Sequence, residues 1–488
     1  MLIWFQGWPC HLPHAIALAL KERYGIKDFS ALVLGYKQKN FLETQRDIKY
    51  DPIVVVQDIF LKSMELKIDY KYLSTLEKYG SPSLWMCPLA DRDLLMYNNY
   101  KFYTHEEHMK IIQGYFKYTR EMLEKVKPDF IIMVPAESME LLVLHNLAKD
   151  MHIPTLMISS TRTGDRYTVH KNTYQQFERI FEIYDRIEKE NYKSPHKKAA
   201  VRYIQEFRRR HVTFAEYKAT YKGQQEFFES ILKHPIKNLK RALDYFYNYY
   251  FGYYKNDYMY KNKSPLKLIL RELKIRFKRT FKKSKIFESP DYREPYVYFP
   301  LHFEPEIALS LLAPFYMDQA ALVENIAKSL PIHFKLYVKE HPMMIGFRPK
   351  SFYQRLRKMP NVRLIDPFTS SYELSKNAKI VAVITGSAGW EALLLKKPVI
   401  TFGHVFFNKL KMVKKVRDIT SLHEVISDIL RNYRHDEKQL VNFVTAIYEG
   451  SFSMDPLEIS KGLPEVLSTP SFNNLVTALA KEMGLEKS

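Results

Sequence analysis

Short apolar runs alternate with segments of helical periodicity along most of the chain. The clearest example spans residues 126–158, where an apolar run at 130–134 precedes a helical pattern at 139–149 and a second apolar run at 155–158. Such runs between helices are typical of parallel strands covered by helices. The pattern therefore predicts βαβ units and a parallel sheet.

The alternation fills residues 1–175 and resumes near residue 291, but residues 176–290 read as helical throughout. Beyond residue 293, strands and helices are expected in turn at 296–299, 317–329, 334–338, 351–358, 362–364, 372–376 and 380–384. We predict an α/β fold with two Rossmann-like domains, 1–175 and 291–430. A helical insert at 176–290 separates them, and a helical tail at 431–488 follows.

Length and cysteine content narrow the class of protein. A chain of 488 residues is too long for one hydrophobic core and suggests several domains. Its two cysteines favour a reducing compartment. No stretch reaches the roughly 18 apolar residues of a membrane span, and the apolar start is too short for a signal peptide. We expect a cytoplasmic protein.

The net charge of +21 is concentrated in one segment. Residues 191–290 hold 25 Lys and Arg against 8 Asp and Glu, a net charge of +17, and eight tyrosines lie at 245–260. Within 261–283, apolar residues at helical spacing predict an amphipathic helix with a cationic face, suited to peripheral docking on an anionic membrane. The docking residues would be Lys274, Lys278, Arg279 and Lys282. An ordinary helix with solvated lysines is an equally open alternative.

Three loops carry polar residues directly after predicted strands of the second α/β domain. The first contains His302 and Glu304, the second contains Lys339 and His341, and the third spans residues 385–389. Ligands of open parallel sheets bind outside the carboxyl ends of the strands, where such loops meet. The three loops therefore predict one binding site.

The third loop consists of small residues, Thr385, Gly386, Ser387, Ala388 and Gly389, before a predicted helix. Small residues let a phosphate approach the backbone N–H groups of a helix N-terminus, where the macrodipole favours an anion. Glu391, expected in the first helical turn, would then suit a ribose hydroxyl pair. The alternatives are close helix–sheet packing for the loop and a simple N-terminal charge for the carboxylate.

The stretches YVYFPLHFEPE, LYVKEHP and ITGSAGWEALLLKKPVITFG resemble the bacterial capsular polysaccharide biosynthesis family, which includes transferases of Kdo from CMP-Kdo. The resemblance covers residues 293–405, is weaker at 127–160 and hardly includes the basic insert. It implies a GT-B fold, in which two Rossmann-like domains face a cleft. The donor nucleotide-sugar would bind the C-terminal domain and the acceptor the N-terminal one, without a metal or another cofactor.

The resemblance also implies roles for residues of the three loops. His341 would contact the donor phosphate with Lys339 beside it, and Ser387 and Glu391 would contact phosphate and ribose. The remaining donor-binding residues would be His302, Glu304, Thr385 and Gly386.

The N-terminal domain should supply the base that deprotonates the acceptor hydroxyl. Glu137 follows the strand at 130–134 and is favoured over His11, which follows the first strand. Arg162 and Arg166 follow another strand and would hold an acidic acceptor. A plain helix-start charge and solvated arginines are the alternatives. Asp91-Arg92-Asp93 has the spacing of a metal motif, but no apolar strand precedes it, so a loop is expected.

A glycosyltransferase of surface polysaccharide synthesis is the leading functional hypothesis, with a nucleotide-sugar donor and a glycan or lipid-linked acceptor as partners. A UDP-sugar 2-epimerase is a second hypothesis, weakened because the loop at 302–306 lacks the arginines that such enzymes carry. Nucleic-acid binding is suggested by the basic tyrosine-rich segment. No recognised motif supports it, so no specific nucleic acid is expected.

Overall fold

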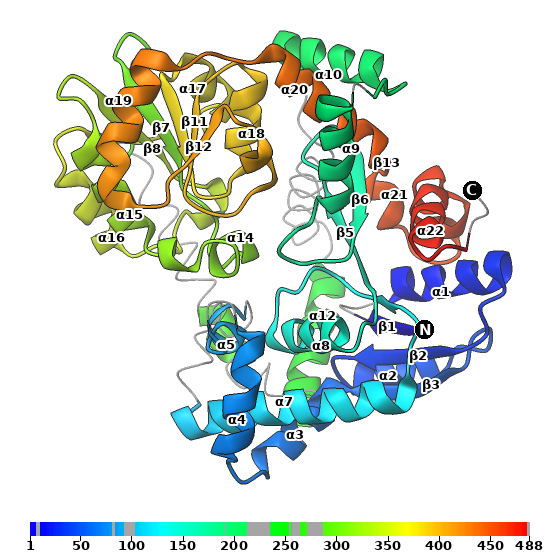
Figure 1. Cartoon of the computed structure of the whole chain (residues 1–488). Helices are drawn as coiled ribbons and strands as arrows, with labels where there is room; N and C mark the ends of the chain where they lie inside the picture. The colour runs from blue at the N-terminus through cyan, green and yellow to red at the C-terminus, as the bar shows by residue number, and fades with distance from the viewer. Residues whose placement is uncertain are drawn as a thin grey trace. The chain divides into compact units, whose positions relative to one another are not determined.

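The computed structural model of the chain describes residues 1–5, 10–80, 83–91, 103–190, 192–211, 235–252, 255, 264–270 and 286–485. The chain forms two compact units (Figure 1). Unit 1 combines residues 1–179, 213–267 and 450–488, and unit 2 combines residues 180–212 and 268–449.

Unit 1 is built on a seven-stranded sheet with the order β13-β6-β5-β4-β1-β2-β3. Its strands are β1 Leu2–Phe5, β2 Phe29–Val33, β3 Tyr50–Val55, β4 Ile131–Ile132, β5 Thr155–Ser160, β6 Arg166–His170 and β13 Phe452–Ser453. β1 to β5 pair in parallel, whereas β6 is antiparallel to both of its neighbours. The predicted βαβ unit at 126–158 is confirmed, with α8 (Met139–Asp150) between β4 and β5.

The described helices of unit 1 cover this sheet or extend from it. They are α1 His11–Tyr24, α2 Tyr36–Glu43, α3 Val56–Met64, α4 Tyr70–Leu76, α5 Met86–Leu89, α7 His105–Val126, α8, α12 Pro235–Tyr250, α21 Pro456–Ile459 and α22 Pro470–Glu482. One core cluster joins residues of α1, β1 to β3 and α22, which bury aliphatic and aromatic side chains together.

Unit 2 is built on a six-stranded sheet that is parallel throughout, with the order β12-β11-β10-β7-β8-β9. Its strands are β7 Tyr296–Pro300, β8 Lys335–Lys339, β9 Val362–Ile365, β10 Ile380–Val383, β11 Val399–Thr401 and β12 Val413–Lys415. The strands are short and buried on both faces, as continuous apolar runs predict. The two Rossmann-like α/β folds expected from the alternating pattern are confirmed.

The described α-helices of unit 2 are α9 Glu178–Lys189, α10 Lys197–Arg210, α14 Ile307–Ser310, α15 Gln319–Ser329, α16 Lys350–Arg357, α17 Ser371–Asn377, α18 Ser387–Leu394, α19 Leu422–Asn432 and α20 Glu437–Glu449. α15, α16 and α19 pack with the sheet into one core. α10 packs on α20, and Arg208 of α10 forms a bidentate ion pair with Glu437 at 2.7 and 2.9 Å.

The division of the chain differs from the four consecutive segments that the pattern predicts. The first part of the expected insert, residues 180–211, joins unit 2, whereas α12 is counted with unit 1. The expected helical tail is divided as well, because α20 belongs to unit 2 and residues 450–485 return to unit 1 with a strand, β13. Within the described part of the chain, no helix has the length and apolar character needed to cross a membrane.

Candidate functional site

The three polar loops lie at the carboxyl ends of three adjacent strands of unit 2. β7 lies between β10 and β8, so the loops that follow these strands meet at one edge of the sheet. From β7 the chain adds β8 and β9 on one side and then returns to β10 on the other side. This reversal creates a crevice between the β7 and β10 loops, where open α/β sheets bind ligands.

His302, two residues after β7, is buried and oriented by its neighbours. Its Nε2 accepts a hydrogen bond from the Thr385 backbone N–H at 3.3 Å, and its backbone N–H donates to Gln319 Oε1 at 2.8 Å. Burial lowers the pKa of His302 to about 3, with smaller contributions from nearby His341 and Arg348, so the ring is neutral. Because Nε2 accepts, the ring proton belongs on Nδ1, which has no partner among the described residues.

Arg348 is a central residue of this site that sequence reasoning did not identify. Its guanidinium donates to the His302 carbonyl at 2.7 Å and to Glu304 Oε1 at 2.8 Å, and it forms an ion pair with Glu340 at 2.8 Å. Arg348 and Glu340 are almost fully buried, and Glu340 also accepts a hydrogen bond from Tyr353. Arg348 therefore ties the β7 loop to the β8 loop.

His341 begins the short 3-10 helix Pro342–Met344. Its Nδ1 accepts a hydrogen bond from the Met343 backbone N–H at 3.2 Å, which leaves the ring proton on Nε2. Burial lowers the pKa of His341 to about 4, helped by Lys339 and Arg348. His341 is therefore a neutral hydrogen-bond donor, and the expectation that it neutralises phosphate charge must be corrected to Lys339 alone.

Lys339 and Glu391 form an opposed pair without a direct ion pair between them. Burial lowers the pKa of the Lys339 ammonium to about 8, against the attraction of Glu340, Asp366 and Glu391. Burial raises the pKa of the Glu391 carboxyl to about 7, against the attraction of Lys339. Buried ionisable groups with displaced pKa values at a strand edge are typical of functional sites.

The small-residue loop between β10 and α18 serves two different purposes. Gly386 is the N-cap of α18 and has no side-chain cap, and a Cβ there would lie 3.3 Å from His302 Nε2. Gly389 instead allows close packing, because a Cβ there would lie 2.8 Å from Phe407 and Val383. The Thr385 hydroxyl donates to the Ala308 carbonyl at 3.0 Å and supports the loop.

Glu391 is not in the first turn of α18, contrary to the prediction. The helix begins at Ser387, so Glu391 is its fifth residue and lies above Ser387 on the same face. A carboxylate one turn from the N-terminus interacts weakly with the helix dipole, which makes the simple helix-charge interpretation less favourable. The uncapped N–H groups of α18 and Ser387 remain directed to the crevice end of the helix.

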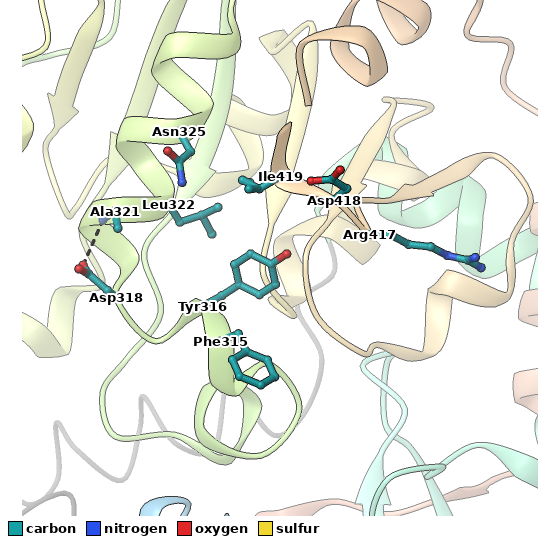
Figure 2. A pocket seen from close by; sticks show the side chains of 9 residues that line it. All are labelled: Phe315, Tyr316, Asp318, Ala321, Leu322, Asn325, Arg417, Asp418 and Ile419. Carbon is teal, nitrogen blue, oxygen red and sulfur yellow. Dashed lines mark hydrogen bonds between the residues drawn. The ribbon is translucent and has the colours of Figure 1, made fainter. Parts of the chain in front are cut away.

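The same unit carries an open pocket of about 400 Å³ that the sequence did not predict. Figure 2 shows that it lies between the start of α15 and the chain after β12, with Tyr316 in its middle and Arg417 and Asp418 at one end. None of the three predicted loops contributes to its lining, which consists of Phe315, Tyr316, Asp318, Ala321, Leu322, Asn325, Arg417, Asp418 and Ile419.

Unit 1 winds in the same way as unit 2, and its predicted base residues lie at its own reversal point. β1 is flanked by β2 and β4, so the chain after β1 and the chain after β4 meet at one sheet edge. His11 is the first residue of α1, and Glu137 lies two residues before α8. His14, by contrast, is fully buried with Nδ1 2.8 Å from the Tyr50 hydroxyl, and it is a core histidine.

The two predicted acceptor-binding arginines differ in their surroundings. Arg166 opens β6, and its guanidinium donates to the side chain of Ser451 at 2.9 Å and to the Ser451 carbonyl. This guanidinium joins β6 to the C-terminal segment, so the structure gives it an architectural role. Arg162 lies in the turn between β5 and β6 with a positive φ of 58°.

Asp91 belongs to a helix cap. It is buried, and its carboxylate accepts a hydrogen bond from the Met139 backbone N–H at 2.9 Å, at the start of α8. The membrane-docking residues predicted in the basic segment, Lys274, Lys278, Arg279 and Lys282, lie outside the described residues.

Comparison with known proteins gives one family match. Residues 191–413 match the model of a family described as capsule polysaccharide biosynthesis protein. Protein FixF of Sinorhizobium fredii (strain NBRC 101917 / NGR234) is 28% identical over 186 residues, 36% of this chain and 43% of that protein. The chain thus spans less than half the length of this relative.

Two solved structures illustrate the structural similarity. Thermosulfurimonas dismutans KpsC, a beta Kdo 2,4 transferase, has a TM-score of 0.36 and 14% identity, with 71% of this chain and 86% of that chain covered. The UDP-GlcNAc 2-epimerase of Methanocaldococcus jannaschii has a TM-score of 0.27 and 15% identity, with 92% and 97% covered.

The family match confirms the resemblance that the three loops predict, since residues 191–413 contain all of them. It also extends further than expected. The match begins at residue 191, so the basic segment lies inside it, whereas the predicted resemblance began at residue 293.

Proposed function

We propose that the protein is a glycosyltransferase of capsule-type surface polysaccharide synthesis that uses a nucleotide-sugar donor. The observation that carries the proposal is the convergence of Lys339, His341 and the uncapped α18 N-terminus at one reversal point of a parallel sheet. This sheet edge lies inside the segment that matches the capsule polysaccharide biosynthesis family.

The chemistry of these groups suits the phosphate of a leaving nucleotide. Lys339 supplies a buried positive charge, since its pKa of about 8 keeps it largely protonated at neutral pH. The Nε2–H of His341 and the N–H groups of α18 donate hydrogen bonds without added charge. Fixed donors in a partly dry site stabilise the charge that develops on the leaving phosphate. We propose that transfer proceeds on these groups without a metal.

Glu137 is our proposed base for the acceptor hydroxyl, with His11 as the alternative, because both lie at the reversal point of unit 1. A base there would take the hydroxyl proton as the oxygen attacks the donor sugar. The proposed acceptor is a glycan or lipid-linked glycan, with Arg162 positioned for an acidic group. The proposed location is the inner face of the cytoplasmic membrane.

A panel of CMP-, UDP-, GDP- and dTDP-sugars tests the proposal, with the melting temperature and release of free nucleotide as readouts. One class of donor should stabilise the protein selectively. His341→Ala should then lower turnover by roughly 10²–10³, the effect of losing one donor to the leaving group, with little change in stability. His333→Ala, on an exposed surface histidine, is the control.

Two results would contradict the proposal. One is a His341→Ala variant with full transfer activity. The other is conversion of UDP-GlcNAc to its 2-epimer without any transfer, which would identify the epimerase alternative.

A further inference from the structure

Helix α12 of unit 1 exposes a continuous apolar stripe. Its members recur at i, i+3, i+4, i+7 and i+8, the spacing of one helical face. They are Leu243 (61% exposed), Phe246 (48%), Tyr247 (61%), Tyr250 (41%) and Phe251 (71%), the last directly after the helix.

The opposite face of α12 is more polar than this stripe. Asn248 is buried, and its amide donates to the Asp244 carbonyl at 2.8 Å. Tyr245 and Tyr249 beside it are only half-buried. A helix that buries an asparagine while it exposes leucine and phenylalanine reverses the usual arrangement of a surface helix. The exposed stripe is therefore not a core face.

A second short helical segment repeats the pattern. Residues 265–270 are helical and expose Leu266, Ile269 and Leu270, again at i, i+3 and i+4. Eight of the 21 large apolar side chains that are exposed in the described part of the chain thus lie between residues 243 and 270. Soluble proteins usually scatter such residues singly, and concentrated ones mark interaction surfaces.

We propose that the α12 stripe docks on an anionic lipid bilayer. Tyrosine and phenylalanine suit the membrane interface, where the rings are buried and the tyrosine hydroxyls stay hydrated. The surrounding segment, residues 191–290, has a net charge of +17, and Lys240 and Lys255 are exposed near the two ends of the stripe. An apolar stripe within a strongly basic segment matches the charge and depth of an anionic membrane surface.

The stripe adds an apolar contribution that basic residues alone do not supply. α12 has 16 residues and a length of about 24 Å, and it would lie in the plane of the interface. Salt screens the charged part of the attraction but not the burial of the rings. Docking of this kind gives a reason for a lipid-linked acceptor under the proposed function, yet it is tested without any transfer reaction.

The first experiment is co-sedimentation of the full chain with vesicles of equal parts phosphatidylcholine and phosphatidylglycerol, or of phosphatidylcholine alone. We expect binding to the anionic vesicles, weakened but not abolished at high salt. The variant Phe246→Ser/Tyr247→Ser/Phe251→Ser should lower the partition coefficient at least about tenfold. The matched control Tyr70→Ser/Ile332→Ser/Phe368→Ser removes three exposed apolar side chains elsewhere and should bind like the wild type.

The second experiment reports the stripe directly. Cys10 and Cys87 are buried, and burial raises the pKa of each thiol to about 12, so a single new cysteine can be labelled selectively. An environment-sensitive dye on Phe251→Cys should shift its emission to the blue with anionic vesicles, whereas the same dye on Phe368→Cys should not.

Three outcomes would overturn the inference. They are unchanged vesicle binding by the triple variant, a Phe251→Cys label that stays hydrated, and a wild-type dimer that the triple variant dissociates in the absence of vesicle binding. Transfer to a soluble acceptor should be unaffected in the triple variant, so failure of docking and failure of the proposed activity give different results.

Discussion

Burial and a neighbouring cation act on Glu391 in opposite directions. Burial raises the pKa of this carboxyl from about 4.5 to about 7, and Lys339 lowers it by less. Because the folded state binds the proton more tightly than the unfolded state, folding is favoured at low pH. This stabilisation is lost as the pH rises from about 4.5 through 7. A carboxylate held in such a position is better explained by ligand binding than by helix stability.

Glu391→Gln should therefore have opposite effects on stability and affinity. At pH 8 the free energy of unfolding should rise by about 1–2 kcal/mol, because a half-buried charge is removed, and at pH 4 it should hardly change. Nucleotide affinity at pH 8 should fall by about 1.5–3 kcal/mol through loss of a charge-assisted hydrogen bond to ribose. Urea denaturation at the two pH values and calorimetric titration measure these changes.

Glu424→Gln provides the matched control, since Glu424 is an exposed acidic residue in the first turn of α19. It should leave nucleotide affinity unchanged. If Glu391→Gln lowered stability at pH 8 and kept full affinity, the carboxylate would be a simple helix charge.

Which site residues the sequence predicts depends on how local their signal is. His302, Lys339, His341 and Ser387 directly follow apolar runs, so their place at a strand end is readable from the pattern. Arg348 was missed because its partner Glu304 is 44 residues away and only the fold brings the two together. An arginine shortly after a Lys-Glu-His-Pro motif with an unassigned acid is the one signal that pointed to it.

At the scale of the element, the β10–α18 joint needs glycine for two physical reasons. Gly389 faces the sheet, where Val383 and Phe407 leave no room for a methyl group. Buried Trp390 beside it packs on Phe406 and Phe443 and fixes the helix in place. Gly386 has an ordinary φ of −68° and faces His302 at the uncapped helix N-terminus.

A pair of alanine substitutions separates these roles. Gly389→Ala should lower the free energy of unfolding by about 1–3 kcal/mol, because the new methyl group overpacks the interface between α18 and the sheet. Gly386→Ala should change stability little and weaken nucleotide binding several-fold, since its methyl group crowds the phosphate approach. Denaturation and nucleotide titration of both variants make the comparison. Equal losses of stability without a loss of affinity would show that the whole loop serves packing.

The elements that the sequence predicts best are those with a continuous apolar run. The βαβ unit at 126–158 and the strands β7, β8 and β10 have such runs, and each was expected within a few residues. β6, with the sequence Arg-Tyr-Thr-Val-His, lacks one, and β13 has two residues. These two strands were missed because their pairing depends on distant segments and not on local pattern.

At the scale of the whole molecule, the C-terminal segment completes unit 1. After α20, β13 pairs with β6 at the edge of the unit 1 sheet, and α22 packs against α1 (Figure 1). Glu482 of α22 forms ion pairs with Arg179 at 2.7 Å and Lys171 at 3.1 Å, and Arg23 donates to Asn473 at 2.7 Å. Unit 1 is thus assembled from segments more than 400 residues apart, which no local pattern reveals.

Removal of this segment should unfold unit 1. α22 buries Phe472, Leu475, Val476 and Leu479 almost completely. At roughly 1.5–3 kcal/mol for each buried side chain, they contribute about 6–12 kcal/mol, comparable to the whole stability of a typical domain. A chain truncated after Glu449 should therefore be insoluble or cleaved by protease within residues 1–179, while fragments of unit 2 stay protected. Limited proteolysis with mass spectrometry identifies the fragments, and a chain truncated after Leu485 is the control because it keeps α22. Equal protection of residues 1–179 in both truncated chains would mean that unit 1 has a stable core without α22.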